Sequence, residues 1–132
     1  FDDYSQTLAV NTVGPVRVTR ALLPNLRASG MKTVVNITSR LGSIALTDNG
    51  VFYGYRESKA ALNMFTRTLA NELKPEGFTC LTIHPGWVQT DMGGENANLT
   101  PAVSISGMRA VIAERGPEDS GTSCTYSVEA ET

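Results

Sequence analysis

Two short runs of apolar and β-branched residues, at 33–38 and 78–83, flank a long segment at 55–74 with helical periodicity. In that segment apolar residues such as Leu69 and Leu73 recur at steps of three and four, which predicts an amphipathic helix. The two shorter runs are typical of strands. Because strands joined through a helix form right-handed parallel crossovers, the sequence predicts an α/β fold around a parallel sheet.

The rest of the chain continues this alternation of helices and strands. The remaining predicted elements are a helix at 2–29, loops at 39–54 and from Pro85-Gly86 onward, a weaker helix at 100–114 and a short strand at 123–128. Pro15 and Pro24 are expected to interrupt the first helix, because proline lacks the N–H that a helix needs. Gly30 is expected to end it.

The composition excludes several classes of function. The chain has 132 residues, which suit a single domain at 1–132, and its net charge of −2 leaves no basic surface for nucleic acid. No apolar run is long enough to span a membrane and no signal peptide is present, so a cytoplasmic protein is expected. Cys80 and Cys124 are expected to be one buried and one surface thiol in a reducing compartment. No metal site is expected.

The ends of the predicted strands are the places to look for a site. In parallel sheets, ligands bind outside the carboxyl ends of the strands, which places candidates just after Thr38 and Ile83. Beyond the first of these ends lies a Y-x-x-x-K motif formed by Tyr55 and Lys59. Residues four apart share a helix face, and an ammonium there would favour the phenolate and make the tyrosine a usable general acid/base. Alone, this motif also fits an ordinary surface helix with a solvated lysine.

Several motifs in a fixed order resemble the short-chain dehydrogenases/reductases. They are LAVNTVGPVRVTRALLPNL, VVNITSRLGS, YGYRESKAALNMFTRTLANEL and HPGWVQTDM. The segments NITSRLGSIAL, GYRESKAALNM, HPGWVQTDMGG and PEDSGTSCTY are most similar to the carbonyl-reductase-like subgroup called Sniffer and C-factor. The resemblance covers about residues 8–126 and implies a partial Rossmann-type doubly wound sheet.

The resemblance also implies a catalytic set. Tyr55 would exchange a proton with a carbonyl oxygen, and Lys59 would bind the ribose of a nicotinamide cofactor and tune Tyr55. Ser39 would hydrogen-bond the reacting oxygen. Asn11 would hold a water in a proton relay.

A cofactor, NADH or NADPH with NADPH slightly favoured, is implied as well. The cofactor-binding residues implied are Tyr55, Lys59, Pro85, Gly86, Val88 and Thr90. The Val88 backbone and the Thr90 hydroxyl would hold the nicotinamide carboxamide after the Pro85-Gly86 turn. The cofactor itself would carry the hydride.

Some assignments have rivals. Ser43 competes with Ser39, because the spacing from Ser39 to Tyr55 is longer than the family usually shows. Ser39 is preferred because it directly leaves the strand and precedes R-L-G. Thr90 could be only a helix cap, and His84 is expected to be a strand-end residue.

Local departures from the family pattern are also visible. Glu57 occupies a position that is usually small, and it would either weaken the effect of Lys59 or face solvent. Gly50 and Gly54 are expected to be turn glycines. Pro15 cannot donate to the Asn11 carbonyl, which would leave that carbonyl for a relay water, unless the proline simply kinks a surface helix.

The larger departure is an absence. The glycine-rich βαβ half is missing from the sequence, so NAD and NADP cannot be told apart. Both ends are expected to be cut. The full-length protein is expected to be a homodimeric or tetrameric enzyme that interconverts a carbonyl and an alcohol, with the isolated chain inactive. The alternatives are a C-factor-like signalling or interaction protein without enzymatic activity, and a decayed relative.

Overall fold

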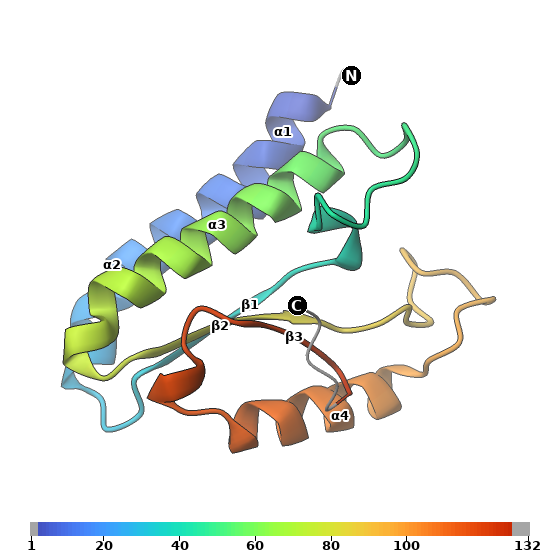
Figure 1. Cartoon of the computed structure of the whole chain (residues 1–132). Helices are drawn as coiled ribbons and strands as arrows, with labels where there is room; N and C mark the ends of the chain where they lie inside the picture. Colours follow the sequence, from blue (N-terminus) through green and yellow to red (C-terminus); the bar gives the residue numbers. More distant parts are fainter. Residues whose placement is uncertain (1–2, 128–132) are drawn as a thin grey trace.

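A computed structural model describes residues 3–127 and contains one parallel sheet (Figure 1). The strands lie in the order β1 (Thr33–Ile37), β2 (Thr79–His84) and β3 (Ser123–Thr125). Val34 pairs with Cys80 in the first ladder, and Ile83 pairs with Cys124 in the second. Because both ladders are parallel, the strands end at one edge, and the predicted parallel α/β fold is confirmed.

Helices cover both faces of this sheet. The structure has helices α1 (Tyr4–Leu8), α2 (Gly14–Ala28), α3 (Tyr55–Leu73) and α4 (Pro101–Glu114), and short turns η1 (Ala9–Val13), η2 (Arg40–Gly42), η3 (Lys74–Glu76) and η4 (Pro117–Asp119). Figure 1 shows α1, α2 and α3 on one face and α4 on the other. The two-sided covering is that of a doubly wound sheet.

The larger core lies between α3 and β2. The apolar stripe predicted for α3 is buried, with Leu69 and Leu73 packed against Phe78 and Cys80. Phe78 is fully buried but lies one residue before the strand, which runs from Thr79 to His84 rather than over 78–83 as predicted. The apolar side chain of Phe78 resembles that of a buried strand residue, but the ladder with β1 begins at Thr79.

A smaller core lies between α4 and the strands. It contains Ile83, Val111 and Cys124. Cys124 is therefore buried, and because Cys80 is buried as well, the prediction that one of the two thiols lies on the surface is wrong. The reason is tertiary, since α4 covers β3. Both thiols are free, and burial raises the pKa of Cys80.

The first helical segment deviates from its prediction at both prolines. Pro24 does not interrupt α2, which runs through it to Ala28 with the proline on the exposed side. Just before Pro15, the helix widens into the π-turn η1, where the N–H of Gly14 bonds to the carbonyl of Ala9. The lost α-helical bond at Pro15 thus coincides with a local change of helix type, and such π-turns are frequent at functional sites.

The other element bounds follow the predictions closely. The strand predicted at 33–38 ends at Ile37, and α4 begins at Pro101 with Thr100 as its cap. The last strand covers Ser123–Thr125, and Val128 lies outside the described residues. Within residues 3–127, every helix is too short or too polar to span a lipid bilayer. The same residues contain no cluster of three His, Cys, Asp or Glu side chains placed to hold a metal ion.

Candidate functional site

Polar contacts fix the position of α3 along β1. The Thr38 hydroxyl donates to Asn63 Oδ1 at 2.5 Å, and Lys59 Nζ donates to the Ile37 carbonyl at 3.0 Å. Asn36 lies earlier on the strand, and its Nδ2 donates to Thr66 Oγ1, which lies later on α3 than Asn63. The helix therefore runs antiparallel to the strand, and its first turn lies beyond the carboxyl end of β1.

Tyr55 and Lys59 lie together on that first part of α3. Lys59 Nζ is 5.8 Å from the centroid of the Tyr55 ring. Lys59 is half-buried, and this desolvation lowers the pKa of its ammonium. The bond to Ile37 uses one of the three donors of the ammonium and holds the charge at the end of the strand.

The turn η2 sets Ser39 next to this helix. Ser39 Oγ accepts a hydrogen bond from the Leu41 N–H at 3.1 Å, and the Ser39 carbonyl accepts from the Gly42 N–H at 2.9 Å. A Cβ at Gly42 would lie 2.8 Å from the Cβ of Lys59 and 2.9 Å from its carbonyl carbon. Glycine at this position is thus what allows the turn that starts at Ser39 to reach the backbone of α3.

Ser43 lies on the other side of that contact. Its carbonyl accepts a hydrogen bond from the Thr47 hydroxyl at 2.8 Å. Ser43 lines a cavity of about 470 Å³ together with residues of the following loop and of α3, among them Ile44, Val51 and Arg56. Ser39 is not among the residues that line this cavity, so the structure distinguishes the surroundings of the two candidate serines.

Asn11 contacts α3 through a residue that sequence reasoning did not single out. Asn11 Nδ2 donates to Ser58 Oγ at 3.1 Å, and the fully buried Ser58 donates to the Tyr55 carbonyl at 2.7 Å. Thr12 adds a bond from its hydroxyl to the Ser58 carbonyl at 2.8 Å. Ser58 thus joins η1 to the turn that carries Tyr55, and its place inside the Y-x-x-x-K motif was the available signal.

Glu57 has a local structural role that the sequence did not indicate. Its carboxylate accepts a hydrogen bond from the Gly54 N–H at 2.7 Å and so caps the start of α3. Gly54 has a φ of 79° and is a turn glycine, as predicted. A Cβ there would lie 3.3 Å from the Tyr4 ring, so α1 packs against the start of α3.

The loop after β2 holds Val88 in a short stretch of paired backbone. Val88 forms a parallel bridge with Leu99, in which Gln89 N–H donates to the Leu99 carbonyl at 2.8 Å. The Leu99 N–H donates to the Trp87 carbonyl at 3.1 Å. In such a bridge the N–H and C=O of Val88 itself point away from Leu99. The Thr90 hydroxyl lies 3.5 Å from the Val88 carbonyl, and the contact of Val88 with a carboxamide stays a prediction.

Gly86 and Pro85 fix the start of the same loop. Gly86 has a φ of 82°, and a Cβ there would meet Leu99 and the Tyr126 ring. The buried Ser104 hydroxyl donates to the Pro85 carbonyl at 2.6 Å, which ties the loop to α4. Neither the packing at Gly86 nor the bond to Pro85 was visible in the sequence pattern, because both depend on elements distant in the chain.

Thr90 caps a turn rather than a helix, and His84 ends a strand. The Thr90 hydroxyl accepts a hydrogen bond from the Gly93 N–H at 3.1 Å, which makes it a turn-capping residue. His84 is the last residue of β2, as predicted.

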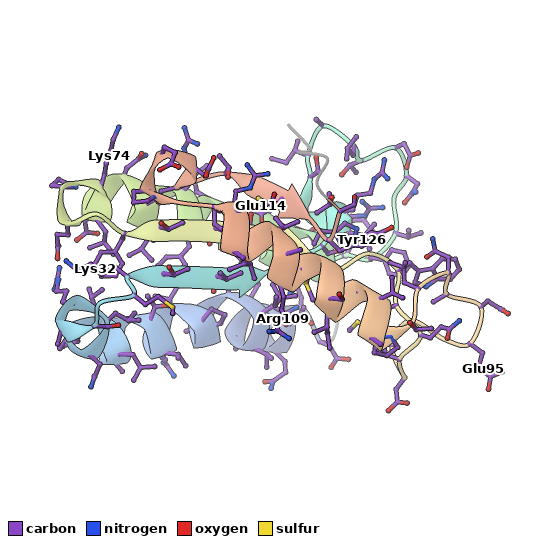
Figure 2. The ribbon with its side chains drawn as sticks, turned by 90° about the horizontal axis from the view of Figure 1, so that it is seen from below. Lys32, Lys74, Glu95, Arg109, Glu114 and Tyr126 are labelled. Atoms are coloured by element: carbon purple, nitrogen blue, oxygen red, sulfur yellow. The ribbon has the colours of Figure 1, made fainter. Side chains whose placement is uncertain are left out.

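Figure 2 shows Glu95, in the loop after β2, at the opposite end of the molecule from Lys32 and Lys74, which flank the amino-terminal ends of β1 and β2.

Comparisons with known proteins identify the family of this chain. The family model for short-chain dehydrogenases matches residues 1–100. The chain belongs to the short-chain dehydrogenase family. It is 48% identical over 126 residues to the protein named C-signal of Myxococcus xanthus, covering 96% of this chain and 76% of that protein.

Solved structures of carbonyl reductases share the fold of this chain. The carbonyl reductase Sniffer of D. melanogaster is 35% identical with a TM-score of 0.89, and the match covers 95% of this chain and 55% of Sniffer. An NADPH-bound carbonyl reductase from chicken fatty liver is also 35% identical with a TM-score of 0.87, covering 99% of this chain and 58% of that one. The predicted partial Rossmann-type fold is confirmed, and the chain spans a little over half the length of both solved structures.

Proposed function

We propose that this chain is the catalytic part of an NAD(P)H-dependent oxidoreductase that interconverts a ketone or aldehyde and an alcohol. The observation that carries the proposal is the position of the Lys59 ammonium, 5.8 Å from the Tyr55 ring and bonded to the strand-end carbonyl of Ile37. A cation on the same helix face as a phenol, at the carboxyl end of a parallel strand, is an arrangement suited to proton transfer by the tyrosine. Membership of the short-chain dehydrogenase family supports the same chemistry.

In the proposed reaction, each residue of the chain acts at a defined point. When bound, the nicotinamide cofactor supplies a hydride to the carbonyl carbon. The Tyr55 hydroxyl gives its proton to the carbonyl oxygen, and takes it back in the reverse direction. The Ser39 hydroxyl donates a hydrogen bond to that oxygen as negative charge develops on it. Lys59 stabilises the phenolate that Tyr55 becomes. Asn11 holds a water of the relay that returns a proton to Tyr55.

The loop after β2 would hold the nicotinamide end of the cofactor. The N–H and C=O of Val88 point away from Leu99, as binding of a carboxamide requires. The Thr90 hydroxyl accepts from the Gly93 N–H and donates across 3.5 Å to the Val88 carbonyl, and its second lone pair would accept from the carboxamide. The two Lys59 donors not used by Ile37 would bind the ribose hydroxyls. We further propose NADPH as the cofactor and a homodimer or tetramer as the working form.

Replacement of Tyr55 by phenylalanine in the complete protein tests this function. General acid/base catalysis is worth about 10²–10⁴-fold, so carbonyl reduction by Tyr55→Phe should fall by at least that factor while the ring packing is kept. Tyr4→Phe is the matched control, because the Tyr4 ring packs against Gly54 at the start of the same helix. Turnover by Tyr55→Phe equal to that of the control would falsify the assignment.

The proposal concerns the complete protein, and the 132-residue chain alone is expected to be inactive. In the described residues, β1 pairs only with β2, so its other edge is open. The chain also lacks a glycine-rich turn to bind the cofactor pyrophosphate. Isothermal titration of the purified chain with NADPH and NADH should detect no binding. Tight binding by a well-folded monomer would show that no further segment is needed.

One comparison favours a second function. The chain is 48% identical to the Myxococcus xanthus protein named C-signal, so the second candidate is a role in signalling without carbonyl reduction. The two candidates differ in their dependence on Tyr55. A signalling activity that survives in Tyr55→Phe, in a protein that reduces no carbonyl, would favour the second candidate over the first.

A further inference from the structure

Arg56, the residue after the proposed general acid, holds the loop that precedes α3. Its Nε donates to the Val51 carbonyl at 2.9 Å, and its Nη2 donates to Asn49 Oδ1 at 2.9 Å. A longer contact of 3.5 Å joins its Nη1 to the Thr47 hydroxyl. One guanidinium therefore binds three points of a segment that has no regular secondary structure. An arginine that merely kept the surface solvated would not be expected to do this.

The same arginine braces a strained backbone. Phe52 has a φ of 63°, a left-handed conformation that is unfavourable for a residue with a bulky side chain. The Phe52 carbonyl accepts a hydrogen bond from the backbone N–H of Arg56 at 3.1 Å, beside the side-chain bond to Val51. Strain of this kind persists only where the surroundings over-determine the conformation. Here Arg56 bonds to the carbonyls of both Val51 and Phe52, on either side of the Phe52 Cα.

The braced conformation exposes three large side chains next to Tyr55. Val51, Phe52 and Tyr53 are 49%, 60% and 59% exposed, and we call them the apolar rim. An exposed apolar cluster that a protein holds at the cost of backbone strain is a binding surface in many proteins. The rim ends two residues before Tyr55 in the chain, at the start of α3, so a shift of this loop would change the surroundings of that tyrosine.

We propose that Arg56 is a positioning residue that holds the apolar rim beside Tyr55 and thereby determines the affinity for carbonyl substrates with bulky apolar groups. The inference rests on the proposed function. Arg56 touches no reacting atom, and its action is on substrate binding rather than on proton transfer. Loss of its bonds should therefore raise KM selectively and leave kcat close to that of the wild type.

Steady-state kinetics of the complete protein with two carbonyl substrates test this inference. For Arg56→Ala, KM for a bulky aryl ketone should rise about tenfold, a factor that corresponds to roughly 1.4 kcal/mol. The KM for a small aldehyde and both kcat values should stay within about threefold of wild type. Arg56→Lys keeps the charge but not the planar fork, so its KM for the ketone should fall between those of wild type and Arg56→Ala.

Two further measurements separate the possible outcomes. Hydrogen exchange of residues 47–53 should be faster in Arg56→Ala, and unchanged in the control Arg67→Ala, which loses only one bond, to the Gly121 carbonyl. An unchanged ketone KM, an equal rise for both substrates, or a kcat loss as large as that of Tyr55→Phe would overturn the inference while leaving the proposed function in place. A wild-type protein that reduces neither substrate would instead remove the proposed function, and this inference with it.

Discussion

The loops that leave β1 and β2 at the same edge of the sheet are held in place by different means. The loop after β1 is fixed from outside, by the Arg56 side chain and by the contact between Gly42 and Lys59. The loop after β2 is fixed largely by itself, through the Val88–Leu99 bridge and the bond from Trp87 Nε1 to the Gly93 carbonyl. Single side-chain changes on α3 should therefore reshape the first loop, while the second should keep its conformation when one of its side chains is changed.

The difference matters because the two loops have different tasks in the proposed reaction. Ser39 and Tyr55, which would handle the substrate oxygen, flank the externally held loop. Val88 and Thr90, which would hold the cofactor, lie in the self-paired loop. A binding site for a constant cofactor benefits from a rigid, self-contained turn, whereas substrate preference can change through the contacts that hold the first loop.

The largest effect is expected from replacing the catalytic serine, and it decides between Ser39 and Ser43. Ser39→Ala in the complete protein should lower kcat about 10²–10³-fold, because it removes a donor aimed at the developing charge. Ser43→Ala is the matched change four residues later, on the far side of Gly42, and should alter kcat only modestly. Measurement of kcat for both variants checks this. The reverse ranking would show that the catalytic serine faces the cavity lined by Ile44 and Val51.

A smaller effect is expected from the contact between Gly42 and Lys59. Gly42→Ala would place a Cβ 2.8 Å from the Cβ of Lys59, and forced overpacking typically costs about 1–3 kcal/mol. Gly50→Ala is the control, since the nearest atom to its Cβ would be the Tyr53 hydroxyl at 3.7 Å. Urea unfolding of the complete protein should show reduced stability for the first variant alone. Equal stability of the two would mean that η2 can move away from α3 without loss.

The smallest effect concerns the Lys59 ammonium, which bonds α3 to β1. The loop after β2 has no such charge, because residues 85–99 include neither lysine nor arginine. Burial lowers the pKa of Lys59 below its ordinary value of 10.5, so the folded protein binds this proton less tightly than the unfolded chain. The charged form therefore costs stability at neutral pH, and the cost disappears as pH rises from the lowered pKa toward 10.5.

Lys59→Met should remove that cost. The variant should gain stability relative to wild type at neutral pH, by less than about 1 kcal/mol because a half-exposed charge is partly screened. The difference between the two proteins should shrink as pH rises toward 10.5. Urea unfolding at neutral pH and at high pH measures it. A difference that grows with pH would show that the bond to the Ile37 carbonyl, rather than desolvation, dominates at this residue.

The fold was predictable because its signals are local and repeated. The helical periodicity of α3 and the β-branched run of β1 each depend on neighbouring residues, and both elements form as predicted. Cys124 shows where this reasoning ends, since its burial depends on α4 packing over β3. Glu57 shows a second limit, because its carboxylate caps a glycine N–H and the usual Ser or Thr signal of a capping box is absent.

The candidate site was predictable in its residues but not in the contacts that arrange them. The resemblance assigned Ser39, Tyr55 and Lys59, and their roles remain predictions. The bonds of Arg56 to Val51 and Asn49 depend on the three-dimensional course of an irregular loop, which no periodicity encodes. The bond of Asn11 to Ser58 likewise joins residues 47 positions apart.

The π-turn η1 also bears on how the first helical segment can vary in length. A π-turn contains one residue more than an α-turn, so Ala9–Val13 stores a surplus residue within a continuous helix. Loss of one residue there would leave an ordinary α-turn, and Leu23 and Leu26 would keep their contacts with the core. Loss of one residue within α2 would instead turn part of its apolar stripe toward solvent. The segment can therefore lose one residue at η1 and remain helical, but Asn11 would then move away from Ser58.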